Sequence, residues 1–201
     1  MEALFYWNYS VKVVQENVSF LINPFEFNSK NDNIKVIFTN WVNSNIDSFI
    51  RNCNFKDLDI YTTEKTCEKL KKSWFTSLTY FQSFFDFSPE IKLFFCWETY
   101  ENICLEINNK NIYYIINPEK IDFGQIGYKR IDLLLINLDY YKNNISSLIN
   151  KISNLSCNYV VPIYSWNYKD ILQDSLEFSR AVIINNLWKP KLLKSGQYIY
   201  I

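Results

Sequence analysis

Histidine is absent from this 201-residue chain, and glycine occurs only three times. Without an imidazole, a Ser-His-Asp triad, a Cys-His pair and a histidine-ligated zinc ion are all excluded. Three glycines cannot build the phosphate-binding loops G-x-G-x-x-G or G-x-x-x-x-G-K-[ST], and Gly124 and Gly127, the one close pair, lack the Lys-Ser/Thr that should follow. Composition therefore excludes most common enzyme chemistry.

Net charge is absent as well, because 21 basic residues balance 21 acidic residues. Nucleic-acid-binding proteins usually carry a basic excess, so the overall charge does not favour that class. The five cysteines are odd in number and contain no C-x-x-C pair, which argues against a disulfide framework and a zinc knuckle.

The chain also lacks long apolar runs and a recognisable leader. Its N-terminus, MEALFYWNYS, has no basic segment followed by a cleavable apolar stretch, and the longest apolar runs, such as IDLLLINL, have the length of a strand. We therefore expect an intracellular protein, in the cytoplasm or an organelle interior, that is not secreted and has no membrane span.

Hydrophobic residues make up 48% of the chain and aromatic residues 18%, which is enough for a real core. No repeat or linker-like segment interrupts it, so we expect a single domain over residues 1–201. About 25 asparagines and 25 isoleucines are typical of coding in an AT-rich genome.

Strand-like apolar runs and short amphipathic helices alternate along the chain. Expected strands cover Ala3–Tyr9, Val11–Gln15, Val18–Asn23, Ile34–Phe38, Leu58–Tyr61, Ile91–Trp97, Ile103–Asn108, Ile112–Asn117, Ile131–Leu138, Tyr159–Tyr164 and Gln197–Ile201. Expected helices cover Asn45–Asn54, Thr63–Lys72, Asn143–Leu155 and Asp170–Ser179, with a tight turn at Asn109-Lys110. The aromatic segment Ser73–Ser88 fits neither period.

Seven segments between residues 18 and 201 carry short motifs in a fixed order. They are VSFLINPF, KVIFTNWVNSNID, DIYTTEKTCEKLKK, ICLEINNKNIYYIINPE, IDLLLINL, YVVPIYSW and LLKSGQYIYI. In this order they resemble the metallo-β-lactamase fold family, and most closely its small L-ascorbate-6-phosphate-lactonase-like branch. The resemblance implies an α/β fold: a four-layer αββα sandwich of two mixed β-sheets.

In that family, imidazoles and carboxylates at the strand ends hold one or two zinc ions that ionise a water. The matching positions here, in chain order, are Asn40, Val42, Ser44, Asn45, Asn117 and Tyr164. Amides and hydroxyls are weak neutral ligands, and a valine donates nothing. We therefore expect no metal and no cofactor. The alternative is a new non-metal active site in the same crevice, whose best residues would be Glu98, Glu101, Asp47 and Tyr164.

A chain that resembles a catalytic fold without its ligands is interpreted as a non-catalytic pseudoenzyme. We expect it to be no enzyme but a structural or scaffolding subunit of a larger protein assembly. One alternative is an inactive subunit associated with nucleic acid through the lysines at 65, 69, 71 and 72. Another is a small-molecule binder or residual hydrolase that uses the old crevice.

The segment Ser73–Ser88 holds more aromatic side chains than one helix face can bury. Exposed aromatic residues are typical of protein interfaces. The candidate interface residues are Trp74, Phe81, Phe84 and Phe85; their other interpretation is core packing.

Overall fold

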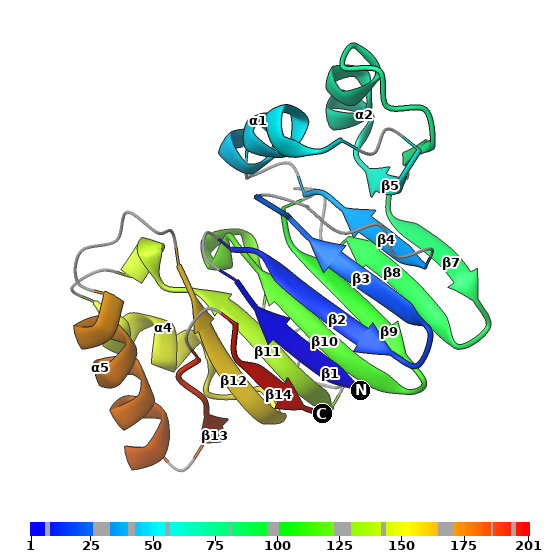
Figure 1. Cartoon of the computed structure of the whole chain (residues 1–201). Coiled ribbons are helices and arrows are strands. Elements are labelled where there is room, and N and C mark those ends of the chain that lie inside the picture. Colours follow the sequence, from blue (N-terminus) through cyan, green and yellow to red (C-terminus); the bar gives the residue numbers. More distant parts are fainter. Residues whose placement is uncertain are drawn as a thin grey trace.

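The structure is a computed structural model that describes residues 1–6, 9–25, 33–39, 43–54, 57–80, 82–95, 101–122, 130–141, 144–164, 171–185, 187–193 and 196–201. Its described strands form two seven-stranded sheets (Figure 1). Each sheet combines antiparallel and parallel pairs, as expected for a mixed sheet.

The first sheet has the strand order β14-β1-β2-β3-β4-β5-β6. Its strands β1 to β3 form an antiparallel meander, and β3 to β6 run parallel to one another. The bounds are β1 Glu2–Phe5, β2 Val11–Gln15, β3 Val18–Ile22, β4 Ile34–Ile37, β5 Asp59–Thr62, β6 Leu78–Tyr80 and β14 Tyr198–Tyr200.

The second sheet has the order β13-β12-β11-β10-β9-β8-β7. Strands β7 to β10 are antiparallel, whereas β10 to β13 are parallel. The bounds are β7 Phe84–Ser88, β8 Ile91–Phe95, β9 Ile103–Ile107, β10 Lys110–Ile115, β11 Ile131–Asn137, β12 Cys157–Ile163 and β13 Lys189–Pro190.

Helices cover the outer face of each sheet. Figure 1 shows α1 and α2 beside the β3–β5 region and α4 and α5 beside β11 and β12. The helices are α1 Asn43–Asn52, α2 Glu64–Lys71, α4 Ile145–Ile152 and α5 Ile171–Ile184, with 3-10 turns at Pro118–Lys120 and Asp139–Tyr141. The expected αββα layers are therefore present.

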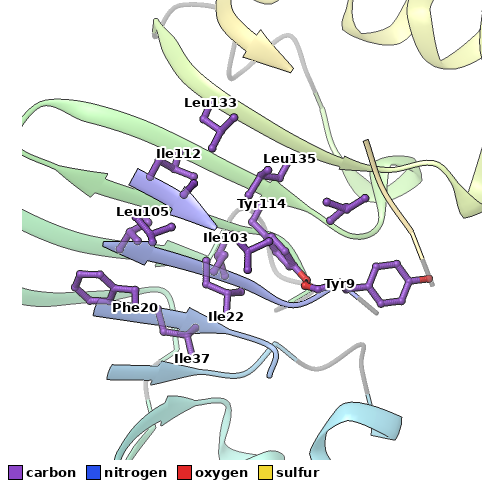
Figure 2. Packing of buried hydrophobic residues seen from close by; sticks show 14 of the residues in the cluster. Tyr9, Phe20, Ile22, Ile37, Ile103, Leu105, Ile112, Tyr114, Leu133 and Leu135 are labelled. Atoms are coloured by element: carbon purple, nitrogen blue, oxygen red, sulfur yellow. The ribbon is translucent and has the colours of Figure 1, made fainter. Parts of the chain in front are cut away.

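Alternation along the central strands divides the core into layers, because successive side chains point to opposite faces of a sheet. In β11, Leu133 and Leu135 pack between the two sheets, whereas Leu134 and Ile136 pack under α4 and α5. In β3, Phe20 also faces the other sheet, and Figure 2 shows it among the isoleucines and leucines of that inner layer. These runs are buried on both faces, which is why they are almost continuously apolar.

One local expectation needs correction. The tight turn between β9 and β10 lies at Asn108-Asn109 rather than Asn109-Lys110, and both asparagines have positive φ, as a type I′ hairpin turn requires.

The segment 73–88, for which the sequence predicts neither a helix nor a strand, contains β6 and β7. In β7, Phe84 is exposed while Phe85 and Phe87 pack towards the core.

No helix in the described part of the chain is both long and apolar enough to cross a membrane.

Candidate functional site

Several buried polar side chains gather where parallel strands end. Asn23 and Thr39 follow β3 and β4 in the first sheet, and Asn137 closes β11 in the second sheet. Because β3 is parallel to β4 and β10 to β11, these residues lie at the carboxyl edges of their sheets. The buried polar residues at these strand ends include Asn23, Thr39, Asn45, Glu101, Asn102, Asn117 and Asn137.

Asn23 is the centre of the first half of this network. Its Oδ1 accepts from the Thr39 backbone N–H at 2.9 Å, and its Nδ2 donates to Thr39 Oγ1 at 3.0 Å and to the Tyr114 hydroxyl at 3.1 Å. Its backbone oxygen accepts from Asn45 Nδ2 at 2.7 Å. Asn23 has a φ of 46°, a left-handed conformation that asparagine tolerates better than most residues.

Tyr114 connects the two sheets. Its hydroxyl accepts from Asn23 and donates to the Tyr9 backbone oxygen at 2.5 Å. Figure 2 shows the Tyr114 side chain pointing towards Tyr9. The Tyr9 hydroxyl in turn donates to the Asp139 carboxylate. Burial raises the pKa of Tyr114, so its hydroxyl keeps the proton that it donates.

The second half of the network fixes the turn after β10. Asn102 Oδ1 accepts from the backbone N–H groups of Ile116 and Asn117, both at 2.8 Å, and Asn102 Nδ2 donates to the Asn117 backbone oxygen at 3.1 Å. Asn137 Nδ2 donates to the Ile116 backbone oxygen at 2.9 Å. These asparagines thus satisfy backbone groups that have no strand partner.

Glu101, a residue that is only 9% exposed, has its carboxylate at this end of the second sheet. Asn117 Nδ2 donates to its Oε2 at 2.7 Å, and Lys120 Nζ lies 3.3 Å from its Oε1. Burial raises the pKa of Tyr140, and the negative charges of Glu101 and Asp139 raise it further. The Oδ1 of Asn117 is buried and accepts no hydrogen bond from the described residues.

The positions matched to metal ligands have different surroundings in the structure. Asn45 and Asn117 belong to the two halves of the network. Tyr164 follows β12 and is half-buried, and this burial raises its pKa. Asn40 and Val42 lie outside the described residues, and so does the side chain of Ser44.

The residues predicted for a non-metal active site do not all lie together. Glu101 lies in the network, whereas Asp47 is on the surface of α1, where it pairs with Lys69 of α2 at 2.7 Å. Glu98 lies outside the described residues. Sequence reasoning missed Tyr9, Asn102 and Asn137; of these, only Asn137 carried a signal, as a polar residue that directly follows the apolar run Leu133–Ile136.

The donors at these strand ends do not fit a transition metal. The side-chain nitrogens of Asn45 and Asn117 already donate to Asn23 and Glu101, and neutral amide oxygens are poor zinc ligands. Within the described ranges, no three His, Cys, Asp or Glu side chains converge on one point. That the chain holds no metal stays a prediction.

The candidate interface residues lie at another edge of the sandwich. The Trp74 side chain is 83% exposed and that of Phe84 is 44% exposed. Phe85 is half-buried, with its ring 4.9 Å from those of Tyr61 and Phe87, so it belongs to the core rather than to the exposed set. Phe81 lies outside the described residues.

No protein-family model matches the chain, and no curated protein sequence is detectably similar to it. Solved structures are similar in fold. Igni18, a metallo hydrolase from the archaeon Ignicoccus hospitalis, superimposes with a TM-score of 0.73 at 13% identity, over 98% of this chain and 97% of that one. An isothiocyanate hydrolase from gut bacteria of Delia radicum gives 0.66 at 12% identity, over 100% and 99%.

A zinc-dependent hydrolase of the metallo-β-lactamase superfamily from Thermotoga maritima gives a TM-score of 0.50 at 12% identity, over 88% of this chain and 84% of that one. The chain therefore has the metallo-β-lactamase fold, and the resemblance seen in the sequence is confirmed at the level of the fold.

The prediction that the chain is not an enzyme is wrong, because several of the structures that share its fold are hydrolases. The prediction relied on the missing histidines and on the replaced metal-ligand positions. The same strand ends retain the buried Glu101 carboxylate beside Lys120, and the loss of metal ligands does not remove that group.

Proposed function

We propose that this chain is a subunit of a larger protein assembly and that it contacts its partner through an exposed surface formed by Trp74, Tyr80 and Phe84, here termed the aromatic edge. The observation that carries the proposal is the 83% exposure of the Trp74 side chain. Tryptophan and tyrosine are enriched among the residues that dominate binding energy at interfaces.

The aromatic edge lies where both sheets end. β6 and β7 are the terminal strands of their sheets, and the chain passes from Tyr80 in β6 to Phe84 in β7. Figure 1 shows β7 on the outer side of the sandwich. A terminal strand presents unpaired backbone groups as well as side chains, so a partner segment has both to bind.

The backbone of Trp74 strengthens this interpretation. Its φ is 67°, and its N–H donates to the Lys71 backbone oxygen at 3.1 Å after the end of α2. A left-handed conformation costs roughly 1–2 kcal/mol for a residue with a Cβ, and glycine or asparagine would adopt it more easily. A bulky indole at such a position, turned towards solvent, therefore indicates a role beyond the helix end.

The surroundings of Trp74 indicate the chemistry of the partner. Lys71 and Lys72 are exposed at the end of α2, directly before it. We propose a protein partner with an apolar groove bordered by acidic side chains. Single-stranded nucleic acid also binds aromatic residues next to lysines, but Lys69 is paired with Asp47, and Glu64 and Glu68 are exposed on the same helix.

Replacing Trp74 and Phe84 together by serine should remove the chain from its assembly. Tagged wild-type chain in extracts of its own cells should elute from size-exclusion chromatography at a mass well above 24.2 kDa, and the double variant at the monomer mass. The free energy of unfolding should fall by only about 1 kcal/mol, the value of one aromatic pair, because Phe84 contacts Phe94 at a ring distance of 5.0 Å.

Tyr200→Ser is the matched control, since Tyr200 is 62% exposed on β14, at the opposite edge of the first sheet. It should elute like the wild type. A wild-type chain that elutes as a monomer, or a double variant that stays in the assembly, would contradict the proposal. Loss of the assembly on nuclease treatment would instead identify nucleic acid as the partner.

A second candidate function is the hydrolysis of a small ester or amide at the strand ends, favoured by Glu101 and by Asn117 Oδ1, which accepts no hydrogen bond from the described residues. In this proposal the Glu101 carboxylate accepts a proton from a water molecule as the water oxygen attacks the carbonyl carbon. The bond from that carbon to the leaving group then breaks, and the leaving group takes the proton from Glu101. Lys120, 3.3 Å from Glu101, would stabilise the negative charge that develops on the carbonyl oxygen. The hydrolase fold supports this candidate.

If Glu101 is the base, Glu101→Gln should lower the turnover of p-nitrophenyl esters by at least about 100-fold, the lower range for loss of a general base. Asp47→Asn, the other acidic residue nominated from sequence, should leave turnover unchanged because Asp47 is occupied by Lys69 on the surface. Wild-type protein without turnover on a panel of such esters, or equal turnover in both variants, would exclude this candidate.

A further inference from the structure

A pocket of about 430 Å³ opens at the end of the second sheet where its parallel strands begin, opposite the strand ends that carry the polar network. Arg130 precedes β11, Cys157 starts β12 and Lys189 starts β13, and all three line it. Neither half of the polar network described above reaches this edge. The volume lies within the range of about 300–1,000 Å³ that small-molecule sites occupy.

The described residues that line the pocket carry charge of one sign. Arg130 and Lys189 are the charged residues among them, and both are cationic. A further cation, Lys191, lies 5.9 Å from the centre of the Tyr159 ring, at the same distance as Lys189. The pocket therefore attracts anions.

Arg130 lies beside the buried carboxylate of Asp132, and its own side chain is 70% exposed. Asp132 Oδ1 accepts from Asn158 Nδ2 at 3.0 Å and lies 3.9 Å from Arg130 Nε, while Asp132 Oδ2 accepts from the Asn111 backbone N–H at 3.0 Å. Arg130 Nη2 donates to Asn158 Oδ1 at 3.4 Å. An arginine guanidinium can donate in parallel to two oxygens of a carboxylate or phosphate.

Aromatic side chains form the remaining wall. Tyr159 and Trp188 both line the pocket, and the Trp188 indole N–H donates to the Leu155 backbone oxygen at 2.9 Å, which fixes the ring. Because the indole N–H is already hydrogen-bonded, a ligand would contact the apolar surface of the Trp188 ring. Leu187 adds a further apolar contact.

We propose that this pocket binds a small organic anion that combines one phosphate or carboxylate group with a planar ring. Arg130 and Lys189 bind the anionic group, and the ring packs against Tyr159 and Trp188. Burial raises the pKa of the Cys157 thiol, so the group stays neutral and does not repel the anion. The proposal does not depend on the assembly or on hydrolysis.

Isothermal titration calorimetry of the full chain tests the proposal with four probes: adenosine monophosphate, benzoate, adenosine and inorganic phosphate. We expect saturable binding of adenosine monophosphate or benzoate, which distinguishes the phosphate from the carboxylate source. Adenosine and inorganic phosphate, which each lack one of the two features, should bind at least about 10-fold more weakly, a difference of about 1.4 kcal/mol.

Arg130→Gln and Lys189→Gln remove the cations and should each weaken the binding of that probe by at least about 10-fold. Lys65→Gln, on the exposed face of α2, removes the same charge elsewhere and should leave binding unchanged. Circular dichroism checks that each variant folds. The proposal is overturned if neither adenosine monophosphate nor benzoate binds. It is also overturned if the probe that binds has the same affinity for Arg130→Gln as for Lys65→Gln.

Discussion

Phe20→Ala should lower the free energy of unfolding by roughly 3–5 kcal/mol, the usual cost of removing a buried phenyl ring. Phe20 is fully buried between the two sheets, and its ring meets that of Phe87 edge-to-face at 5.1 Å. It comes from β3 in one sheet and Phe87 from β7 in the other, so the truncation leaves a cavity at the contact that joins them.

Urea denaturation measures this loss, and thermal unfolding should show a decrease of roughly 10 °C for a chain of this length. Trp74→Ala is the control: it removes a larger aromatic ring from an exposed position and should change stability by no more than about 0.5 kcal/mol. Equal losses in the two variants would mean that Phe20 does not pack as described or that Trp74 is part of the core.

The strands that the sequence predicts well are those buried on both faces. Runs such as Ile131–Asn137 and Ile34–Ile37 are mostly apolar, each has a single charged residue near its start, and both have the length of a strand. The segment 73–88 was unassigned because its aromatic residues occupy both faces. In β7 the exposed Phe84 alternates with Phe85 and Phe87, so hydrophobicity alone shows no period of two.

The strand-end network was only partly predictable. Asn45 and Asn117 were found through the resemblance to a known family, because their positions follow particular strands. Asn102 and Tyr9 could not be found, since a polar residue reveals its role only through partners that are distant in sequence: Tyr9 donates to a residue 130 positions away. The pocket at the other edge is hidden for the same reason, because Arg130 and Trp188 meet only once β11 to β13 lie side by side.

Asn23→Ala should be about as destabilising as a core truncation, by roughly 3–4 kcal/mol. The Thr39 N–H loses its acceptor inside the protein, which costs about 1–3 kcal/mol for a buried donor. Alanine at a φ of 46° adds roughly 1–2 kcal/mol. Asn23→Gly separates these two costs when both variants are compared by urea denaturation. Glycine also lacks the Asn23 side chain but adopts this backbone conformation without strain. The glycine variant should therefore avoid the backbone cost and keep the cost of the lost hydrogen bond. A variant with alanine as stable as the wild type would show that the hydrogen bonds of Asn23 are not formed.

The same substitution tests whether the hydrogen bond between Asn23 and Tyr114 couples the two sheets. Asn23 belongs to the first sheet and Tyr114 to the second, and the Tyr114 hydroxyl stands between Asn23 and the Tyr9 backbone. Tyr114→Phe leaves Asn23 Nδ2 with Thr39 Oγ1 as its acceptor, so alone it should cost about 1–2 kcal/mol. Because both variants break the same hydrogen bond, the double variant should lose less than the sum of the single losses, by about 0.5–1.5 kcal/mol. Additive losses would mean that the hydrogen bond between Asn23 and Tyr114 does not couple the two sheets.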